Sequence, residues 1–113
     1  MKKIEAYIKS KRFHEVMEEL HLIDGLTGLT LFDVKGYGRA RNSQQPVHIV
    51  DNSKNWEPHV KIEIFCKDDL LEVVVSTIQK NAHTGLRGDG KIFITDVIEA
   101  IRISTGEAGK DSV

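Results

Sequence analysis

The residues with the most evident chemical potential lie in the glycine-rich segment 84–91, which the strand-like residues Ile92-Phe93-Ile94 follow directly. Its three glycines permit backbone angles and close approaches that a Cβ would prevent. Consecutive N–H groups with no side chains in the way can surround an anion, and Lys91 adds a positive charge beside them. The segment predicts either a phosphate-binding loop or a plain turn between a helix and a strand, and taken alone it favours neither.

The segment is not an ordinary P-loop. Gly85, Gly90 and Lys91 match the Gly-x-x-x-x-Gly-Lys pattern, but Ile92 stands where Ser or Thr would hold Mg²⁺. The glycines also follow a helix-like run and precede a strand-like one, which reverses the P-loop order. Any phosphate site here must therefore work without a Mg²⁺-binding hydroxyl at this position.

Two further clusters combine basic residues with glycines or hydroxyls next to predicted strands. They are Lys35-Gly36-Tyr37-Gly38-Arg39, with Arg41 close behind, and Arg102 before Ser104-Thr105-Gly106-Glu107. Either cluster alone is typical of a solvated turn. A joint anion site requires that sheet edges or separate subunits bring them to the glycine-rich segment.

Nucleic-acid binding is disfavoured. Lys35-Gly36-Tyr37-Gly38 matches the first half of an RNA-recognition signature, but Arg39-Ala40-Arg41 replaces the aromatic and apolar residues that should follow. The match also lies at the exit of the second predicted strand rather than in the third. Because the formal net charge is −1, we expect no nucleic-acid partner.

The sequence offers no evident metal site or catalytic centre. His14 and His21 are seven residues apart, but no cysteine or carboxylate cluster with metal-ligand spacing accompanies them. No Ser-His-Asp or Cys-His motif is present, and Asp68-Asp69 suits a helix N-terminus better than acid–base catalysis. We predict no metal ligand, no catalytic residue and a protein that is not an enzyme.

Composition indicates one soluble domain over residues 1–113. Hydrophobic residues make up 40% of the chain and charged residues 29%. The single Cys66 excludes an internal disulfide and, in an apolar strand-like run, is expected to be a small buried hydrophobe. The N-terminal residues are charged and alternating, and no run is long enough to span a membrane. We expect a cytoplasmic protein without direct membrane insertion.

Hydrophobic periodicity predicts strands over 3–9, 29–35, 60–66 and 92–94. Helices are expected over about 13–20, with Ser10 as a cap, and over 70–82, with Lys67-Asp68-Asp69 as the N-cap region. One helical turn over 96–100 and a short last strand over 101–103 are also expected. The order β-α-β-β-α-β predicts an α+β, ferredoxin-like fold, a four-stranded antiparallel sheet with both helices on one face. The other face needs a cover, and burial in an oligomer would supply one.

A long polar segment interrupts this pattern between about 39 and 58. Strong strand signals on both sides favour a functional loop over a wrong assignment. Trp56 lies in it, and an indole in a polar loop either anchors that loop or contacts a partner.

With these pieces in order, the chain closely resembles the PII nitrogen-regulatory signal-transduction proteins over nearly its whole length. The resemblance rests on Met1-Lys2-Lys3-Ile4-Glu5-Ala6, Val34-Lys35-Gly36-Tyr37-Gly38-Arg39, Val60-Lys61-Ile62-Glu63-Ile64, Thr84-Gly85, Gly88-Asp89-Gly90-Lys91-Ile92-Phe93, and Ile101-Arg102-Ile103 with Thr105-Gly106-Glu107.

The resemblance implies a homotrimer that binds an adenine nucleotide (ADP, ATP or AMP) between neighbouring subunits. It also implies a flexible signalling loop, about 36–58 here, that regulates a membrane transporter, an enzyme or another regulator. Residues Thr30, Glu63 and Phe65 would lie near the adenine. The other implied nucleotide-binding residues are Gly36, Tyr37, Gly38, Arg39, Gly88, Asp89, Gly90, Lys91, Arg102 and Ser104. Partner-binding loop residues would be Arg41, Val47, Ile49, Asn52 and Trp56.

Four positions depart from the family pattern. Ala40 replaces a glutamine that helps to hold Mg²⁺ and 2-oxoglutarate, so Mg²⁺ binding is left open. His59 replaces a lysine, and Asn52 the tyrosine that some members have uridylylated. Ser104 replaces an arginine whose fork of donors suits a terminal phosphate.

These departures predict a nucleotide sensor that has lost 2-oxoglutarate sensing and tyrosine uridylylation, with a reduced preference for ATP. Two alternatives stay open. One is a sensor of another small anion, such as bicarbonate, together with ADP or AMP. The other is a slow ATPase.

Overall fold

The computed structural model describes residues 1–36 and 57–113, and residues 37–56 lie outside the described part of the chain. The described strands are β1 (Lys2–Lys9), β2 (Thr30–Gly36), β3 (Glu57–Cys66) and β4 (Lys91–Asp96), and the helices are α1 (Phe13–His21) and α3 (Leu71–Ala82). Short 3-10 turns lie before the two helices and near the C-terminus: η1 (Ser10–Arg12), η2 (Asp68–Leu70) and η3 (Lys110–Ser112).

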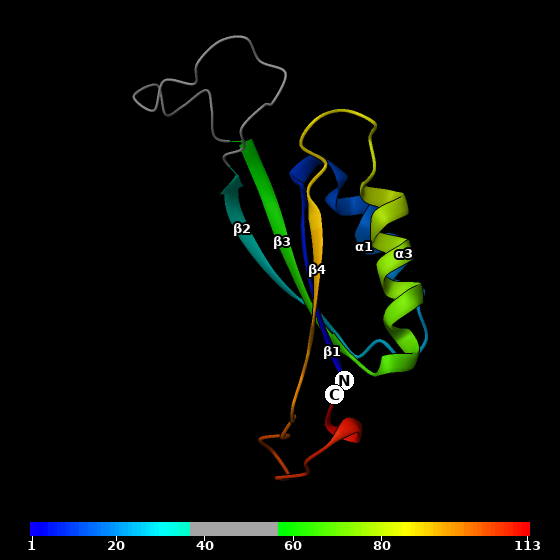
Figure 1. Cartoon of the computed structure of the whole chain (residues 1–113), viewed down its shortest axis with the longest axis vertical. Helices are drawn as coiled ribbons and strands as arrows, with labels where there is room; N and C mark the ends of the chain where they lie inside the picture. Colours follow the sequence, from blue (N-terminus) through cyan, green and yellow to red (C-terminus); the bar gives the residue numbers. More distant parts are fainter. Residues whose placement is uncertain (37–56) are drawn as a thin grey trace.

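The strands form one antiparallel sheet in the order β2-β3-β1-β4, and both helices lie on the same side of it (Figure 1). This is the ferredoxin-like βαββαβ arrangement, so the predicted fold class is confirmed. The described strands extend to the ends of the predicted signalling loop, about 36–58. Gly36 belongs to β2, while Glu57 and Pro58 belong to β3.

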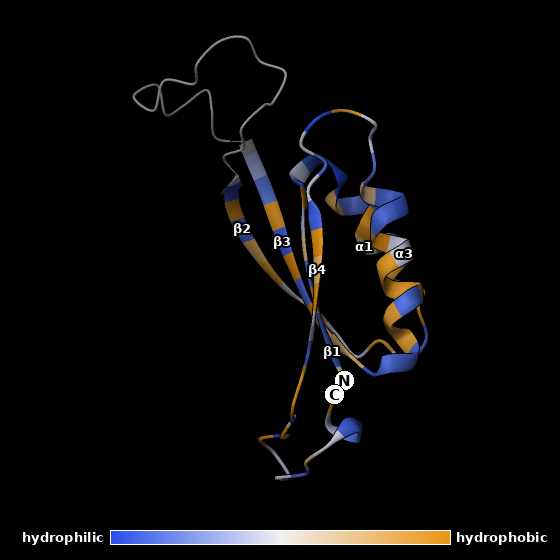
Figure 2. Ribbon diagram, in the orientation of Figure 1, coloured by the Kyte–Doolittle hydropathy of each residue, from blue (hydrophilic) through white to orange (hydrophobic). Residues whose placement is uncertain are grey.

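The hydrophobic core lies between the sheet and the helices, because alternate strand residues point to that side. In the register of β1 and β3, Ile4 lies opposite Ile64 and Ala6 opposite Ile62, and all four side chains are fully buried. Helices α1 and α3 complete the core with Val16, Leu20, Val74, Ile78 and Ala82. Figure 2 shows the alternation as hydrophobic and hydrophilic bands along the strands. Cys66 is buried here, as predicted, and burial raises the pKa of its thiol.

Neither predicted cap region provides a side-chain capping hydrogen bond, although Lys67 is the N-cap residue of η2 and Asp68 and Asp69 lie in its first turn. Ser10 lies in η1, and no side chain caps the start of α1. Asp68 lies in η2, where its carboxylate accepts a hydrogen bond of 2.7 Å from the N-terminal ammonium of Met1. That hydrogen bond lowers the pKa of Asp68. Each helix therefore begins through a tighter 3-10 turn rather than through a side-chain cap.

The segment that follows β4 differs from its prediction. Residues 97–100 form no helical turn, and 101–103 add no strand to the sheet, because Ile101 instead forms an isolated antiparallel bridge with Ala108. Within this bridge the Arg102 N–H donates to the Glu107 carbonyl at 2.8 Å, and the Gly106 N–H donates to the Arg102 carbonyl at 2.7 Å. Residues 97–113, here called the C-terminal arm, thus fold back on themselves.

Two contacts tie the C-terminal arm to the body. The Val97 N–H donates to the Met1 carbonyl at 3.1 Å, and Lys67 Nζ lies 3.3 Å from Asp111 Oδ1. The two chain termini therefore lie close together at one end of the sheet (Figure 1). Ile98 and Ile103 of the arm are almost completely exposed, at 98% and 100%.

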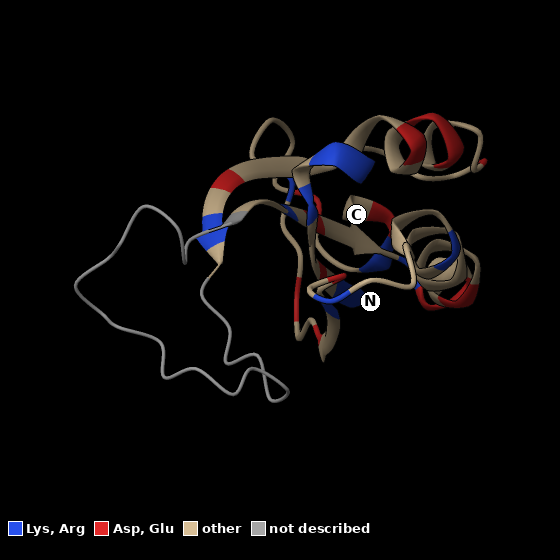
Figure 3. Ribbon diagram, turned by 90° about the horizontal axis from the view of Figure 1, so that it is seen from above, with Lys and Arg blue, Asp and Glu red and all other residues tan. Residues whose placement is uncertain are grey.

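The surface of the described residues carries both charge signs. Figure 3 shows Lys and Arg segments interspersed with Asp and Glu segments. No helix in residues 1–36 and 57–113 is long and apolar enough to cross a membrane.

Candidate functional site

The glycine-rich loop (residues 83–90) connects the end of α3 to the start of β4 and folds around one carboxylate. Asp89 Oδ2 accepts the Thr84 N–H at 2.8 Å and the Gly85 N–H at 3.2 Å, and the Thr84 hydroxyl donates to Oδ1. The hydrogen bonds from Thr84 hold the pKa of Asp89 well below its usual range. Asp89 therefore acts as an internal anion that fixes the shape of the first half of the loop.

A buried lysine, Lys9 at the C-terminal end of β1, contacts this carboxylate. Lys9 is only 7% exposed, and its Nζ lies 3.2 Å from Asp89 Oδ1 and 3.2 Å from Thr84 Oγ1. His83 adds a second contact, with Nδ1 3.5 Å from Asp89 Oδ2. A buried ammonium needs such partners, so Lys9 and the loop depend on each other. Lys9 is not among the residues predicted for the site, because its only sequence signal is a charged side chain at the end of an apolar strand.

The other half of the loop contacts the first residues of β3. His59 Nε2 lies 3.2 Å from the Gly88 carbonyl oxygen. The same imidazole lies against Gly36 at the end of β2, where an added Cβ would be 3.0 Å from His59 Nδ1. The ring therefore connects the ends of two strands with the glycine-rich loop. Lys91, the first residue of β4, is exposed beside this loop.

The residues assigned to the adenine lie together, but in a different part of the sheet. Thr30 of β2 is paired with Glu63 of β3, and both line a cavity of about 440 Å³ with Phe65. The C-terminal arm supplies other walls, among them Ala100 and Ile101. An open cavity lined by the Phe65 ring and by the carboxylates of Glu63 and Glu99 can hold a flat polar heterocycle.

The two groups of predicted residues are separated within one chain. Gly36 pairs with Glu57, whereas Thr30 pairs with Glu63, six residues further along β3. At about 3.3 Å per residue this separation is roughly 20 Å. The glycine-rich loop lies at the Gly36 end of the sheet and the C-terminal arm at the opposite end (Figure 1).

Arg102 and Ser104 belong to the arm and so do not join the glycine-rich loop of their own chain. The Arg102 guanidinium lies 3.7 Å from the Glu107 carboxylate and donates to the Asp111 carbonyl at 3.1 Å. Ser104 is exposed. One chain therefore brings together only part of the predicted set of nucleotide-binding residues.

The sheet face opposite the helices carries an alternating charge network. Lys3 and Lys61 lie between Glu5 and Glu63, with N–O distances from 2.8 to 3.9 Å. The hydrogen bond from Lys3 lowers the pKa of Glu5. Burial opposes the charge of Lys61, yet the neighbouring Glu5 still raises the pKa of this lysine.

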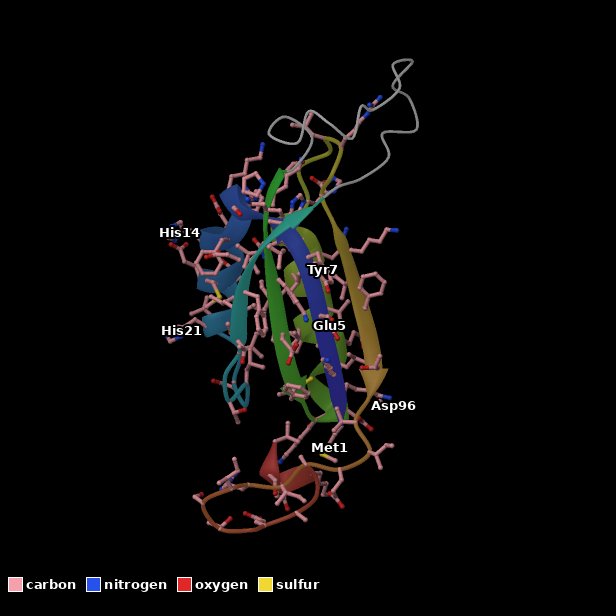
Figure 4. The ribbon with its side chains drawn as sticks, turned by 90° about the vertical axis from the view of Figure 1, so that its left-hand side faces the viewer. Met1, Glu5, Tyr7, His14, His21 and Asp96 are labelled. Atoms are coloured by element: carbon pink, nitrogen blue, oxygen red, sulfur yellow. The ribbon has the colours of Figure 1, made fainter. Side chains whose placement is uncertain are left out.

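Aromatic rings surround this network. Lys61 Nζ lies 5.0 Å from the centre of the Phe32 ring, and Tyr7 meets Phe93 edge to face at 6.0 Å. Figure 4 shows Glu5 and Tyr7 on this face of β1, while His14 and His21 project from α1. Phe32 and Phe93 remain 42% and 51% exposed, so the network lies on a partly apolar and uncovered surface.

Eight predicted residues lie outside the described part of the chain: Tyr37, Gly38, Arg39, Arg41, Val47, Ile49, Asn52 and Trp56. Among residues 1–36 and 57–113, no group of three or more His, Cys, Asp or Glu side chains is arranged to hold a metal ion.

Comparison with known proteins identifies the family. The family model described as "Nitrogen regulatory protein P-II" matches residues 1–107. The chain is 44% identical to "Nitrogen regulatory protein P-II" of Azospirillum brasilense and 45% identical to the protein of that name from Rhodospirillum rubrum, in both cases over 113 residues and the full length of each chain. It is 44% identical over 107 residues to "Nitrogen regulatory protein P-II 1" of Escherichia coli K12, covering 95% of each chain. The chain therefore belongs to the P-II family of nitrogen regulatory proteins.

Proposed function

We propose that this P-II family regulator is a cytoplasmic adenine-nucleotide sensor that works as a homotrimer. The observation that carries the proposal is the split of the candidate site. Within one chain, the residues expected to bind phosphate lie far from those expected to bind adenine. The first are residues 88–91, and the second are Thr30, Glu63 and Phe65. A cleft between two copies can unite the glycine-rich loop of one with the cavity and C-terminal arm of its neighbour.

The charge network on the uncovered sheet face supports assembly through this face. Its four charged side chains are only 18–29% exposed in the single chain, and aromatic rings flank them. Aromatic residues are enriched in oligomer interfaces, and the exposed rings of Phe32 and Phe93 beside the paired charges suit such burial. We expect sedimentation velocity to give a trimer. Glu5→Lys, which gathers three lysines on this face, is expected to dissociate it, whereas Glu18→Lys on the exposed side of α1 is expected to have no effect.

Nucleotide preference is the direct test of sensing. Loss of an arginine at position 104 removes a charge-assisted hydrogen bond worth about 1.5–3 kcal/mol. This corresponds to roughly a ten- to a hundredfold loss in triphosphate affinity. Calorimetry is expected to give similar affinities for ATP, ADP and AMP. An ATP affinity far above the others, raised further by 2-oxoglutarate, would contradict the proposal.

Substitution of Lys91 tests the proposed phosphate contact, and substitution of Lys11 is its control. Its ammonium is exposed at the start of β4, beside the glycine-rich loop, and a point charge there suits phosphate. Lys91→Ala is expected to weaken ADP binding at least tenfold, while Lys11→Ala at the exposed η1 turn leaves it unchanged. Equal losses in both variants would point to a non-specific charge effect instead.

The regulatory output is proposed to pass through residues 36–58 to a partner protein, in keeping with a regulatory rather than a catalytic role. A ligand shifts a conformational equilibrium only by its preference among the states, so nucleotide binding and partner release must weaken together. A pull-down with and without ADP and ATP tests this in wild type and Lys91→Ala. An unchanged partner response in the variant would refute the coupling.

A further inference from the structure

The imidazole of His59 occupies a defined place between two parts of the candidate site. His59 is paired with Val34 on β2 and with Lys9 on β1, so the backbone below the ring is fixed on both sides by the sheet. On one side the ring lies against Gly36, and on the other its Nε2 lies 3.2 Å from the Gly88 carbonyl oxygen.

The chemistry of this contact fixes the role of the nitrogen. A carbonyl oxygen only accepts hydrogen bonds, so His59 Nε2 must carry the proton and donate. Both the imidazolium and the neutral tautomer with the proton on Nε2 satisfy this requirement. The contact therefore does not depend on a change in charge of the ring.

The bond acts on the part of the loop that Asp89 does not hold. The Asp89 carboxylate orders the N–H groups of Thr84 and Gly85, which lie at the start of the loop. Gly88 lies beyond them with a φ of +77°, a conformation that favours glycine, and its carbonyl oxygen lies 3.2 Å from His59 Nε2. Because a peptide bond is planar and trans, fixing the Gly88 carbonyl also fixes the direction of the Asp89 N–H.

We propose that His59 is a positioning residue that holds residues 88–90 of the glycine-rich loop in the conformation that receives phosphate, through donation from Nε2 to the Gly88 carbonyl. The inference rests on the proposed nucleotide site and adds to it a role for a side chain that need not touch the ligand. It also gives the His59 imidazole a task that the flexible ammonium of a lysine would not perform in the same way, since the ring fits flat against Gly36.

Two substitutions of His59 distinguish the effect of its hydrogen-bond donor from that of its flat ring. His59→Phe keeps a flat ring over Gly36 and removes the donor, whereas His59→Gln keeps an N–H donor at nearly the place of Nε2. Loss of one neutral hydrogen bond corresponds to roughly a three- to tenfold loss in affinity. Calorimetry is expected to show this loss for ADP in His59→Phe and recovery of most of it in His59→Gln. Adenosine, which has no phosphate, is expected to bind all three proteins equally.

Amide hydrogen exchange without nucleotide gives a readout independent of ligand binding. The amides of residues 84–90 are expected to exchange faster in His59→Phe than in wild type and to recover in His59→Gln. Wild-type exchange and ADP affinity in His59→Phe would overturn the inference, as would a His59→Gln protein that behaves like His59→Phe. If wild type binds neither ADP nor adenosine, the proposed function fails, and the exchange data alone then decide whether His59 holds the loop.

Discussion

Gly90 lies so close to the main chain of Tyr7 that a Cβ on it would be 1.6 Å from the Tyr7 carbonyl oxygen. Its φ of +101° is also one that side chains rarely adopt. The strand that precedes the first helix and the loop that precedes the last strand are therefore in direct backbone contact, and only glycine permits it.

Gly90→Ala is expected to destabilise the protein by about 2–4 kcal/mol, because backbone atoms of β1 or of the loop must move. Urea unfolding at matched protein concentration measures the loss. Gly85→Ala is the control in the same loop: its φ is +78°, but the nearest atom to an added Cβ is 3.9 Å away. We expect a cost of only about 1 kcal/mol there. Equal costs would show that backbone strain, rather than contact with Tyr7, is what requires glycine.

Lys9→Met should destabilise the loop more than an ordinary surface substitution. It removes a nearly buried ammonium and leaves Asp89 with the donors of Thr84 and Gly85 and the contact with His83. We expect a loss of about 2–3 kcal/mol in the free energy of unfolding, below the usual cost of breaking a fully buried pair because Asp89 stays partly hydrated. A double-mutant cycle with Asp89→Asn isolates the pair. A coupling energy near zero would contradict the assigned interaction.

The lowered pKa of Asp89 predicts an acid-sensitive loop. Since the folded pKa lies below the unfolded one, the unfolded chain binds this proton more readily, and stability decreases as pH falls. The contribution of Asp89 to the free energy of unfolding is complete above the ordinary pKa of an aspartate, about 3.9. It is lost as the pH falls toward the pKa of Asp89 in the folded protein. Asp68 and Glu5 also have lowered pKa values and contribute to the acid sensitivity of every variant. The contribution of Asp89 is therefore measured as the difference between wild type and Asp89→Asn. Below about pH 4, unfolding free energy should fall more steeply in wild type than in Asp89→Asn. Asp24→Asn, at an exposed position, should retain the wild-type slope.

Strand periodicity carried most of the fold prediction. Ile62 and Ile64 alternate with Lys61 and Glu63, and this pattern alone separates the buried from the uncovered face of β3. The pattern is local and repeated, so errors at single positions do not change the assignment. The same regularity explains why the four strands and their order along the chain could be predicted.

Features that depend on which residues a segment contacts could not be predicted in this way. Asp68 has the side chain of a helix cap, but the Met1 ammonium, remote in sequence, engages it instead. Ile101-Arg102-Ile103 alternates like a strand, yet its backbone partners lie within its own arm. Lys9 reads as a charged strand end, and only Asp89 and Thr84 explain its burial. For Asp68 and Lys9 a long-range contact overrides a valid local signal, and for residues 101–103 pairing within the arm does so.

Sequence motifs can name candidate residues for the site, but not the geometry in which the fold places them. Sequence motifs named the glycine-rich loop, whereas the hydrogen bonds that make Asp89 an internal anion follow from the fold. Its carboxylate therefore orders the loop, and any contribution of Asp89 to phosphate binding must come from its backbone N–H.

Ser104→Arg is expected to restore a preference for ATP. Ser104 is exposed on the C-terminal arm two residues after Arg102, whose own guanidinium is held by Glu107 and the Asp111 carbonyl. A second guanidinium at this place adds a fork of donors for a terminal phosphate that Arg102, already engaged, does not supply alone. Calorimetry should show a roughly ten- to a hundredfold gain for ATP and a smaller gain for ADP. Ile103→Arg, at a neighbouring and fully exposed position, adds the same charge and is expected to leave the ratio of the two affinities unchanged. An equal gain in both variants would mean that added charge attracts any nucleotide, and that position 104 does not face the terminal phosphate.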